Sequence, residues 1–154
     1  MSQRAAYDTF AAAGMKTLGG VYMYVSHCGL EKTLVDLVYL RSSQINGCAY
    51  CIDSHSHDLL KEGVSIEKLV LVPAWREAGP IFSERERAAL AWAEVVTNVA
   101  TTHVPDEDYA AAVAVFGEKG LADLTIAIGL INTYNRVAIS FRKTPESVKA
   151  LASA

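Results

Sequence analysis

Several features that mark whole classes of protein are missing from this sequence. Lys and Arg number 14 against 17 Asp and Glu, the net charge is −3, and no basic cluster occurs. Nucleic acid and anionic membrane surfaces are therefore not expected as main partners. No apolar run approaches the roughly 18–20 residues that cross a membrane, and the N-terminal segment lacks the apolar core of a signal peptide. We expect a cytoplasmic protein that spans no membrane.

Cysteine is also scarce. The three cysteines are an odd number, which argues against the disulfide framework of a secreted domain. Cys48 and Cys51 have the C-x-x-C spacing, which in a reducing compartment indicates a redox pair or half of a metal site. The third cysteine, Cys28, is expected to be an ordinary buried or half-buried thiol.

What the sequence does contain is one helical segment after another. At 154 residues, with 51% hydrophobic and 20% charged residues, the chain is long enough for one globular domain with a hydrophobic core. No convincing alternating strand pattern appears, so we predict a single all-α domain over residues 1–154. Helices are expected at 7–27 with a break at Gly19-Gly20, 30–45, 48–62, a short one from 65, 88–100 after a Ser83–Glu86 capping box, 105–117, and 121–142.

The last of these helices carries more apolar residues than one buried face requires. They cover several of its sides: Ile126, Ile128, Leu130, Ile131 and Val137. Surplus apolar surface of this kind is typical of a subunit interface, so we expect a homo-oligomer. A central helix enclosed within a monomer is the alternative interpretation.

Cys48, Cys51 and His55 form the chemically informative pattern. Helical side chains advance about 100° per residue, so these three side chains are expected on one face of a helix. Asp53 and His57 fall on the opposite side, where a solvated role is expected.

The position of the cysteines in their helix matters as much as their spacing. Asn46-Gly47 interrupts the preceding helix, so Cys48 and Cys51 lie in the first turn of a new one. Unpaired N–H groups and the positive end of the helix dipole favour a thiolate there. His55 can accept a proton from a thiol or, when protonated, stabilise a thiolate. Two cysteines three residues apart can also close a disulfide.

Two other interpretations of the cysteine pair stay open. A structural zinc site needs four ligands, and only the two cysteines with His55 or His57 are close in sequence. Cys28 or His103 would have to come from elsewhere in the fold to complete such a site. A purely structural pair of cysteines is the second alternative.

Asp36 interrupts an otherwise apolar helical stretch. A carboxylate in a helix that is apolar on nearly every side is costly to bury unless it has a partner or a task. We therefore regard Asp36 as a candidate functional residue. The alternative is a carboxylate that reaches solvent or pairs with an arginine.

At these positions the chain resembles the alkylhydroperoxidase D-like (AhpD-like) branch of the carboxymuconolactone decarboxylase superfamily. The shared signature is an acidic residue followed by Ser-Gln-Ile-Asn-Gly-Cys-x-x-Cys and a His four residues further on. Here it consists of Asp36, residues 43–48, Cys51 and His55. The similarity continues through 74–77, 83–92, 103–106 and 131–136, and so covers most of residues 30–142.

The resemblance implies an all-helical fold assembled as trimers or hexamers, with a thiol-dependent peroxidase site that needs no bound cofactor or metal. It implies that Cys51 is oxidised by the peroxide substrate and that Cys48 is the resolving, more exposed partner. His55 shuttles the proton, and an external dithiol reductant, such as a lipoyl or thioredoxin-like protein, reopens the disulfide. The helix dipole taken alone would instead make Cys48 the more acidic thiol.

One residue departs from the family pattern. The family usually has Glu where this chain has Asp36, and the shorter side chain is expected to stop about an ångström short of its partner, given hydrogen-bond reach of about 2.6–3.2 Å. Three other functions remain alternatives. They are a cofactor-free decarboxylase or related lyase with His55 as acid and base, a metal-binding or redox-sensing module without turnover, and a structural oligomer.

Overall fold

The computed structural model describes residues 3–152, and this part of the chain contains helices and no strand, which confirms the all-α prediction. The α-helices are α1 (Tyr7–Phe10), α2 (Ala12–His27), α3 (Lys32–Asn46), α4 (Ala49–Lys61), α5 (Ile66–Leu71), α6 (Glu84–Thr97), α7 (Val99–Thr102), α8 (Asp106–Phe141) and α9 (Glu146–Ala152). Two short 3₁₀ turns, η1 (Val72–Ala74) and η2 (Gly79–Ile81), lie between α5 and α6.

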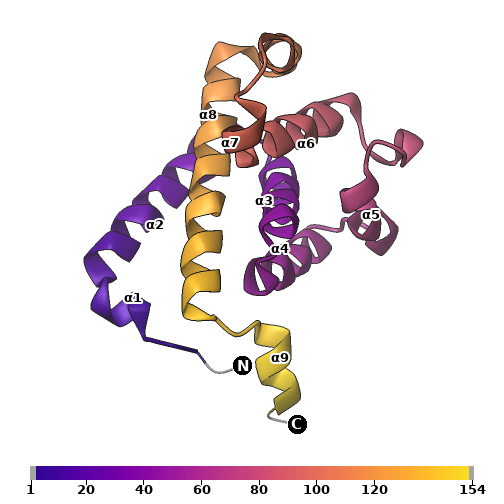
Figure 1. Cartoon of the computed structure of the whole chain (residues 1–154). Coiled ribbons are helices and arrows are strands. Elements are labelled where there is room, and N and C mark those ends of the chain that lie inside the picture. Colours follow the sequence, from indigo (N-terminus) through magenta and orange to yellow (C-terminus); the bar gives the residue numbers. More distant parts are fainter. Residues whose placement is uncertain (1–2, 153–154) are drawn as a thin grey trace.

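Helix α8 runs through the middle of the molecule. Helices α3, α4 and α6 lie on one side of it and α2 lies along the other, while α9 sits below the end of α8 (Figure 1). The sequence of α3 is apolar on nearly every side, and every residue from 34 to 40 is buried. Since such a helix can be stable only when it is covered on all sides, α3 becomes a core element against which α4, α6 and α8 all pack.

Several local signals in the sequence end or begin helices as predicted. Gly47 ends α3 in the left-handed conformation, with a φ of 71° that residues with a Cβ atom rarely adopt. Ser83 and Glu86 form the expected capping box at the start of α6. Gly117, with φ 68° and ψ 168°, breaks α8 where two separate helices were expected to meet.

One local prediction was wrong, and one helix was not predicted. Helix α2 continues through Gly19-Gly20, and the break falls instead at Ala11, which separates α1 from α2. Helix α9 was not predicted, although Pro145 directly precedes it, because its stability depends on a distant contact with α4 described below.

The apolar surplus of the last helix is mostly covered by the chain itself. Ile128, Leu130 and Ile131 are buried, while Ile126 stays 42% exposed. The alternative of a central, enclosed helix therefore explains most of this pattern, and oligomerisation stays a prediction. Within residues 3–152, no helix combines the length and the apolar character that crossing a membrane requires.

Candidate thiol active site

The turn between α3 and α4 places the two cysteines together. Cys48 is the N-cap residue of α4, and its sulfur accepts a hydrogen bond from the N–H of Cys51 at 3.4 Å. A disulfide joins Cys48 to Cys51, with their Cα atoms 5.4 Å apart. The expectation that both sulfurs project from the same side of a newly started helix is therefore confirmed.

A network of buried amides and hydroxyls fixes this turn against α8. Asn135, which is fully buried, donates to Ser43 Oγ at 2.9 Å and accepts from Asn46 Nδ2 at 2.8 Å. Asn46 also donates to Asn132 Oδ1 at 2.9 Å. The carbonyl of Ser43 in turn accepts the N–H of Cys48 at 2.9 Å. Because buried polar groups are costly to leave unpaired, this network holds the cysteine turn in one position.

His55 lies one helical turn beyond Cys51. Its ring packs with its centroid 5.0 Å from that of Tyr39, and its Nδ1 lies 3.3 Å from Oδ1 of Asp36. An ionised carboxylate can only accept hydrogen bonds, so Nδ1 carries the proton of the neutral ring. The other nitrogen, Nε2, is then the basic one. Asp36 therefore sets which tautomer His55 adopts.

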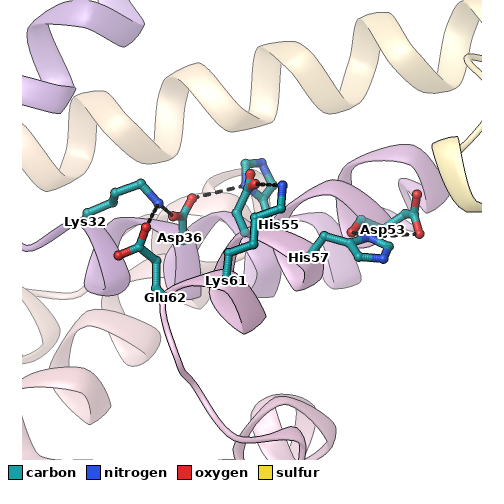
Figure 2. Close-up of polar contacts among 8 residues, drawn as sticks. Lys32, Asp36, Asp53, His55, His57, Lys61 and Glu62 are labelled. Carbon is teal, nitrogen blue, oxygen red and sulfur yellow. Dashed lines mark hydrogen bonds and ion pairs between the residues drawn. The ribbon is translucent and has the colours of Figure 1, made fainter.

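The contact of Asp36 with His55 corrects the expectation drawn from its shorter side chain. The carboxylate reaches the imidazole directly at the long end of hydrogen-bond range, without a bridging group. Its second oxygen accepts from Lys32 Nζ at 3.1 Å, and Lys32 also contacts Glu62 at 3.0 Å. Figure 2 shows Lys32 between the carboxylates of Asp36 and Glu62, with His55 on the other side of Asp36. The basic partner is thus a lysine and not an arginine.

The charge state of Asp36 follows from these contacts. Burial works against the charged carboxylate, but the hydrogen bonds from His55 and Lys32 outweigh it and hold the pKa of Asp36 below its ordinary value. Asp36 is therefore an anion at neutral pH and can support a positive charge on His55.

Cys51 and Cys48 border different cavities. Cys51 and His55 line one of about 280 Å³, and Cys48 borders another of about 480 Å³ between the start of α4 and residues 138–148. Tyr50 and Lys143 border both cavities. Both cysteines are buried, Cys48 1% exposed and Cys51 4% exposed, so the expectation of a more exposed Cys48 is wrong for this chain.

The described residues bring one set of three candidate metal ligands together, and it differs from the cysteine set considered from the sequence. Atoms of Asp36, His55 and Asp58 lie within 4.8 Å of one another. Lys32 already pairs with Asp36, and Lys61 Nζ lies 3.6 Å from Asp58. A metal ion at this position would have to compete with two ammonium groups.

Asp53 and His57 were both expected to be solvated on the side of the helix away from the thiols. This is confirmed for His57 only, because Asp53 is half-buried in a contact with α9. His57 is exposed, and its Nδ1 is hydrogen-bonded to the backbone carbonyl of Asp53 at 2.9 Å. The carboxylate of Asp53 accepts the N–H of Ser147 at 3.1 Å and also the Ser147 hydroxyl, and so anchors the start of α9 to α4. Cys28 is half-buried, as expected, and its thiol donates to the carbonyl of Val25 at 3.0 Å.

The fold and the site define an all-helical protein built around a Cys-x-x-Cys pair, a histidine one turn later and a carboxylate on the neighbouring helix. Comparison with known proteins agrees, since residues 8–95 match the model of the carboxymuconolactone decarboxylase family. The chain belongs to this family, as an AhpD-like member.

Relatives and solved structures support the assignment. The uncharacterized protein YdfG of Bacillus subtilis (strain 168) is 36% identical over 140 residues, which cover 91% of this chain and 95% of YdfG. The crystal structure of ATU0492 from Agrobacterium tumefaciens, a protein of unknown function described as a candidate antioxidant defence protein AhpD, shares 37% identity. The two structures match with a TM-score of 0.89, and the match covers 94% of this chain and 98% of the ATU0492 chain. The debrominase Bmp8 shares the fold at a TM-score of 0.74 with 22% identity, covering 84% of this chain and 69% of its own.

Proposed function

We propose that the protein is a thiol-dependent peroxidase in which Cys51 is oxidised by a hydroperoxide and Cys48 resolves the product. The observation that carries the proposal is that Cys51 and His55 line the same cavity while Cys51 is within disulfide distance of Cys48. The contact between His55 and Asp36 supports it, because it leaves the basic nitrogen of His55 free to take a proton.

The reaction begins from the reduced pair. His55 takes the proton of the Cys51 thiol, and the thiolate attacks the terminal oxygen of the hydroperoxide, so that an S–O bond forms and the O–O bond breaks. The alkoxide leaves as an alcohol with the proton returned by His55. The Cys48 thiol then attacks the Cys51 sulfenic acid, and the disulfide forms as water departs.

An external dithiol reductant completes the cycle. One thiolate of the reductant attacks Cys48 from the cavity of about 480 Å³, which forms a mixed disulfide and releases the Cys51 thiolate. The second thiol of the reductant then attacks its own sulfur in that mixed disulfide, which releases Cys48 and leaves the reductant as a disulfide. Substrate and reductant then approach the disulfide through different cavities. A lipoyl or thioredoxin-like protein has the required chemistry, and the working unit is a homo-oligomer, a trimer or a hexamer. No bound cofactor or metal takes part in this cycle.

The test is a stoichiometric oxidation of the reduced protein with cumene hydroperoxide, followed by turnover with a dithiol. One peroxide is expected to be consumed for each Cys48–Cys51 disulfide formed, and Cys48→Ser and Cys51→Ser should both stop turnover. Cys28→Ser is the matched control, since this thiol borders neither cavity, and it should behave as wild type.

Two results would contradict the proposal. Full hydroperoxide turnover by Cys51→Ser would reject the assignment of the oxidised residue. Activity toward a carboxylated lactone that survives alkylation of both cysteines would instead support the lyase alternative, in which His55 alone is the acid and base.

A further inference from the structure

The cavity beside Cys51 is rich in tyrosine and contains one ammonium group. Its lining includes Tyr7, Tyr22, Tyr50 and Tyr134 together with several aliphatic side chains. Lys143 is the only Lys, Arg, Asp or Glu residue among those that line it. The thiol peroxidase chemistry proposed above gives Lys143 no task.

Lys143 is held at this cavity by the end of α8. Arg142 adopts the left-handed conformation with a φ of 55°, which reverses the chain, and the N–H of Lys143 donates to the carbonyl of Ala138 at 2.9 Å. The side chain is half-buried, and its Nζ lies 4.0 Å from the centroid of the Tyr50 ring. The chain reversal therefore brings this half-buried side chain to the cavity, against the ring of Tyr50.

The ammonium group lacks an anionic partner in the structure. Among residues 3–152, no carboxylate lies within 4.0 Å of the Lys143 ammonium, although most other lysines have such a partner. Burial lowers the pKa of Lys143, but the interactions with Tyr50 and Tyr7 outweigh this effect and raise it overall, so the group is a cation at neutral pH. A half-buried cation in a largely apolar cavity favours binding of an anionic group.

We infer that Lys143 binds the carboxylate of the substrate. The substrate is then an organic hydroperoxide with an apolar or aromatic body and a carboxylate at the end remote from the peroxide. The tyrosine rings pack against the body, Lys143 pairs with the carboxylate, and the terminal peroxide oxygen lies at Cys51 beside His55. This inference rests on the proposed peroxidase function. Hydrogen peroxide has neither the body nor the anion and gains nothing from this lining.

A matched pair of substrates tests the inference. Cumene hydroperoxide and its 4-carboxylate differ only in the anionic group, and wild-type protein is expected to use the carboxylate with a kcat/KM about tenfold higher. Lys143→Met, which keeps the aliphatic stem, should remove this preference by slowing the carboxylate alone, and Lys143→Arg should retain most of it. Lys16→Met, an equal change of charge at an exposed lysine on α2, should leave the preference intact.

The two hydroperoxides also distinguish binding of the substrate carboxylate by Lys143 from stabilisation of the Cys51 thiolate by Lys143. Equal kcat/KM values for the two hydroperoxides in wild-type protein would overturn the inference. So would an equal loss on both substrates in Lys143→Met, because that result would assign Lys143 to stabilising the Cys51 thiolate.

A binding measurement separates this inference from the peroxidase proposal. Calorimetry of the oxidised protein with 4-isopropylbenzoate and the neutral 4-isopropylbenzamide requires no reactive thiol. The benzoate should bind about tenfold more tightly, and Lys143→Met should abolish the difference. Lys143-dependent binding of the benzoate without consumption of either hydroperoxide would reject the peroxidase and retain the carboxylate site. Equal affinities for the two ligands would reject the carboxylate site.

Discussion

Asp36 and His55 meet across helices α3 and α4, with Oδ1 of the aspartate 3.3 Å from Nδ1 of the imidazole. The two residues are 19 positions apart, and each is mostly buried. Their contact places a carboxylate against the imidazole of His55, and His55 lines the same cavity as Cys51. A histidine that is oriented by a carboxylate is also the base that activates nucleophiles in other enzymes.

Replacing Asp36 with Asn should slow the reaction of Cys51 with peroxide about 10- to 100-fold, because the neutral amide no longer supports a positive charge on His55. Single-turnover rates of disulfide formation measure this effect. Glu62→Gln is the matched control, since Glu62 shares Lys32 with Asp36 but is not in contact with His55. Equal rates in Asp36→Asn and wild type would remove Asp36 from the mechanism.

Asp36 should also contribute to acid stability. Its pKa in the folded protein is lowered, so its carboxylate stabilises the fold above the ordinary aspartate pKa of about 3.9, and this contribution is lost as pH falls through the lower folded value. The free energy of unfolding is measured with urea between pH 3 and pH 7, a range that includes the ordinary aspartate pKa of about 3.9. Asp36→Asn should flatten this acid-side decline; an unchanged decline would place its origin in other carboxylates.

His55→Ala and His57→Ala form a pair of variants on one helix. His55→Ala should lower the peroxide rate about 100-fold, since a positioned general base typically contributes at least that much. His57 is exposed and outside the cavity with Cys51, so His57→Ala should leave the rate unchanged. Stopped-flow measurement of both variants at neutral pH decides the matter, and a similar loss in each would point to a general effect on α4.

Asn135→Ala should destabilise the protein by about 2–4 kcal/mol, because it leaves Ser43 and Asn46 without their buried partner and opens a small cavity. Thr133→Ala, at an exposed position on the same helix, should change the free energy of unfolding by no more than about 0.5 kcal/mol. Urea denaturation of both variants provides the comparison. A loss below about 1 kcal/mol for Asn135→Ala would mean that water replaces the missing amide.

Helix α9 should detach from α4 at low pH. Hydrogen bonds from Ser147 hold the pKa of Asp53 below its ordinary value, so the anchor is intact above about pH 4 and is lost as pH falls through the folded pKa. Protection of the amides of residues 146–152 against hydrogen exchange, relative to the intrinsic rate at each pH, should therefore fall in acid, and Ser147→Ala should remove this protection already at neutral pH. Protection that does not change with pH or with this variant would refute the anchor.

The sequence predicted those parts of the fold and the site that depend on neighbouring residues. The capping box at Ser83, the end of a helix at Asn46-Gly47 and the shared face of Cys48 and Cys51 follow from residue types and spacing along the chain. Each is decided within one or two helical turns, where propensities and hydrogen bonds are local.

Features that depend on the distance between helices could not be predicted in the same way. The reach of Asp36 to His55 is set by how closely α3 packs on α4, and a comparison of side-chain lengths alone gave the wrong result. The cavity of Lys143 is formed by segments from both ends of the chain, so no local pattern marks it. The burial of Cys48 likewise depends on residues 138–148, which lie about 90 positions away.

The central claim is that Cys51 is the activated thiol, and the pH dependence of its alkylation tests this most directly. Reduced protein is treated with iodoacetamide across a range of pH, and mass spectrometry assigns each modified site. We predict that Cys51 reacts with an apparent pKa well below about 8.5, the free-cysteine value, and that His55→Ala raises it. A Cys51 that reacts only above that value, or a Cys48 that is the more acidic of the two, would contradict the account.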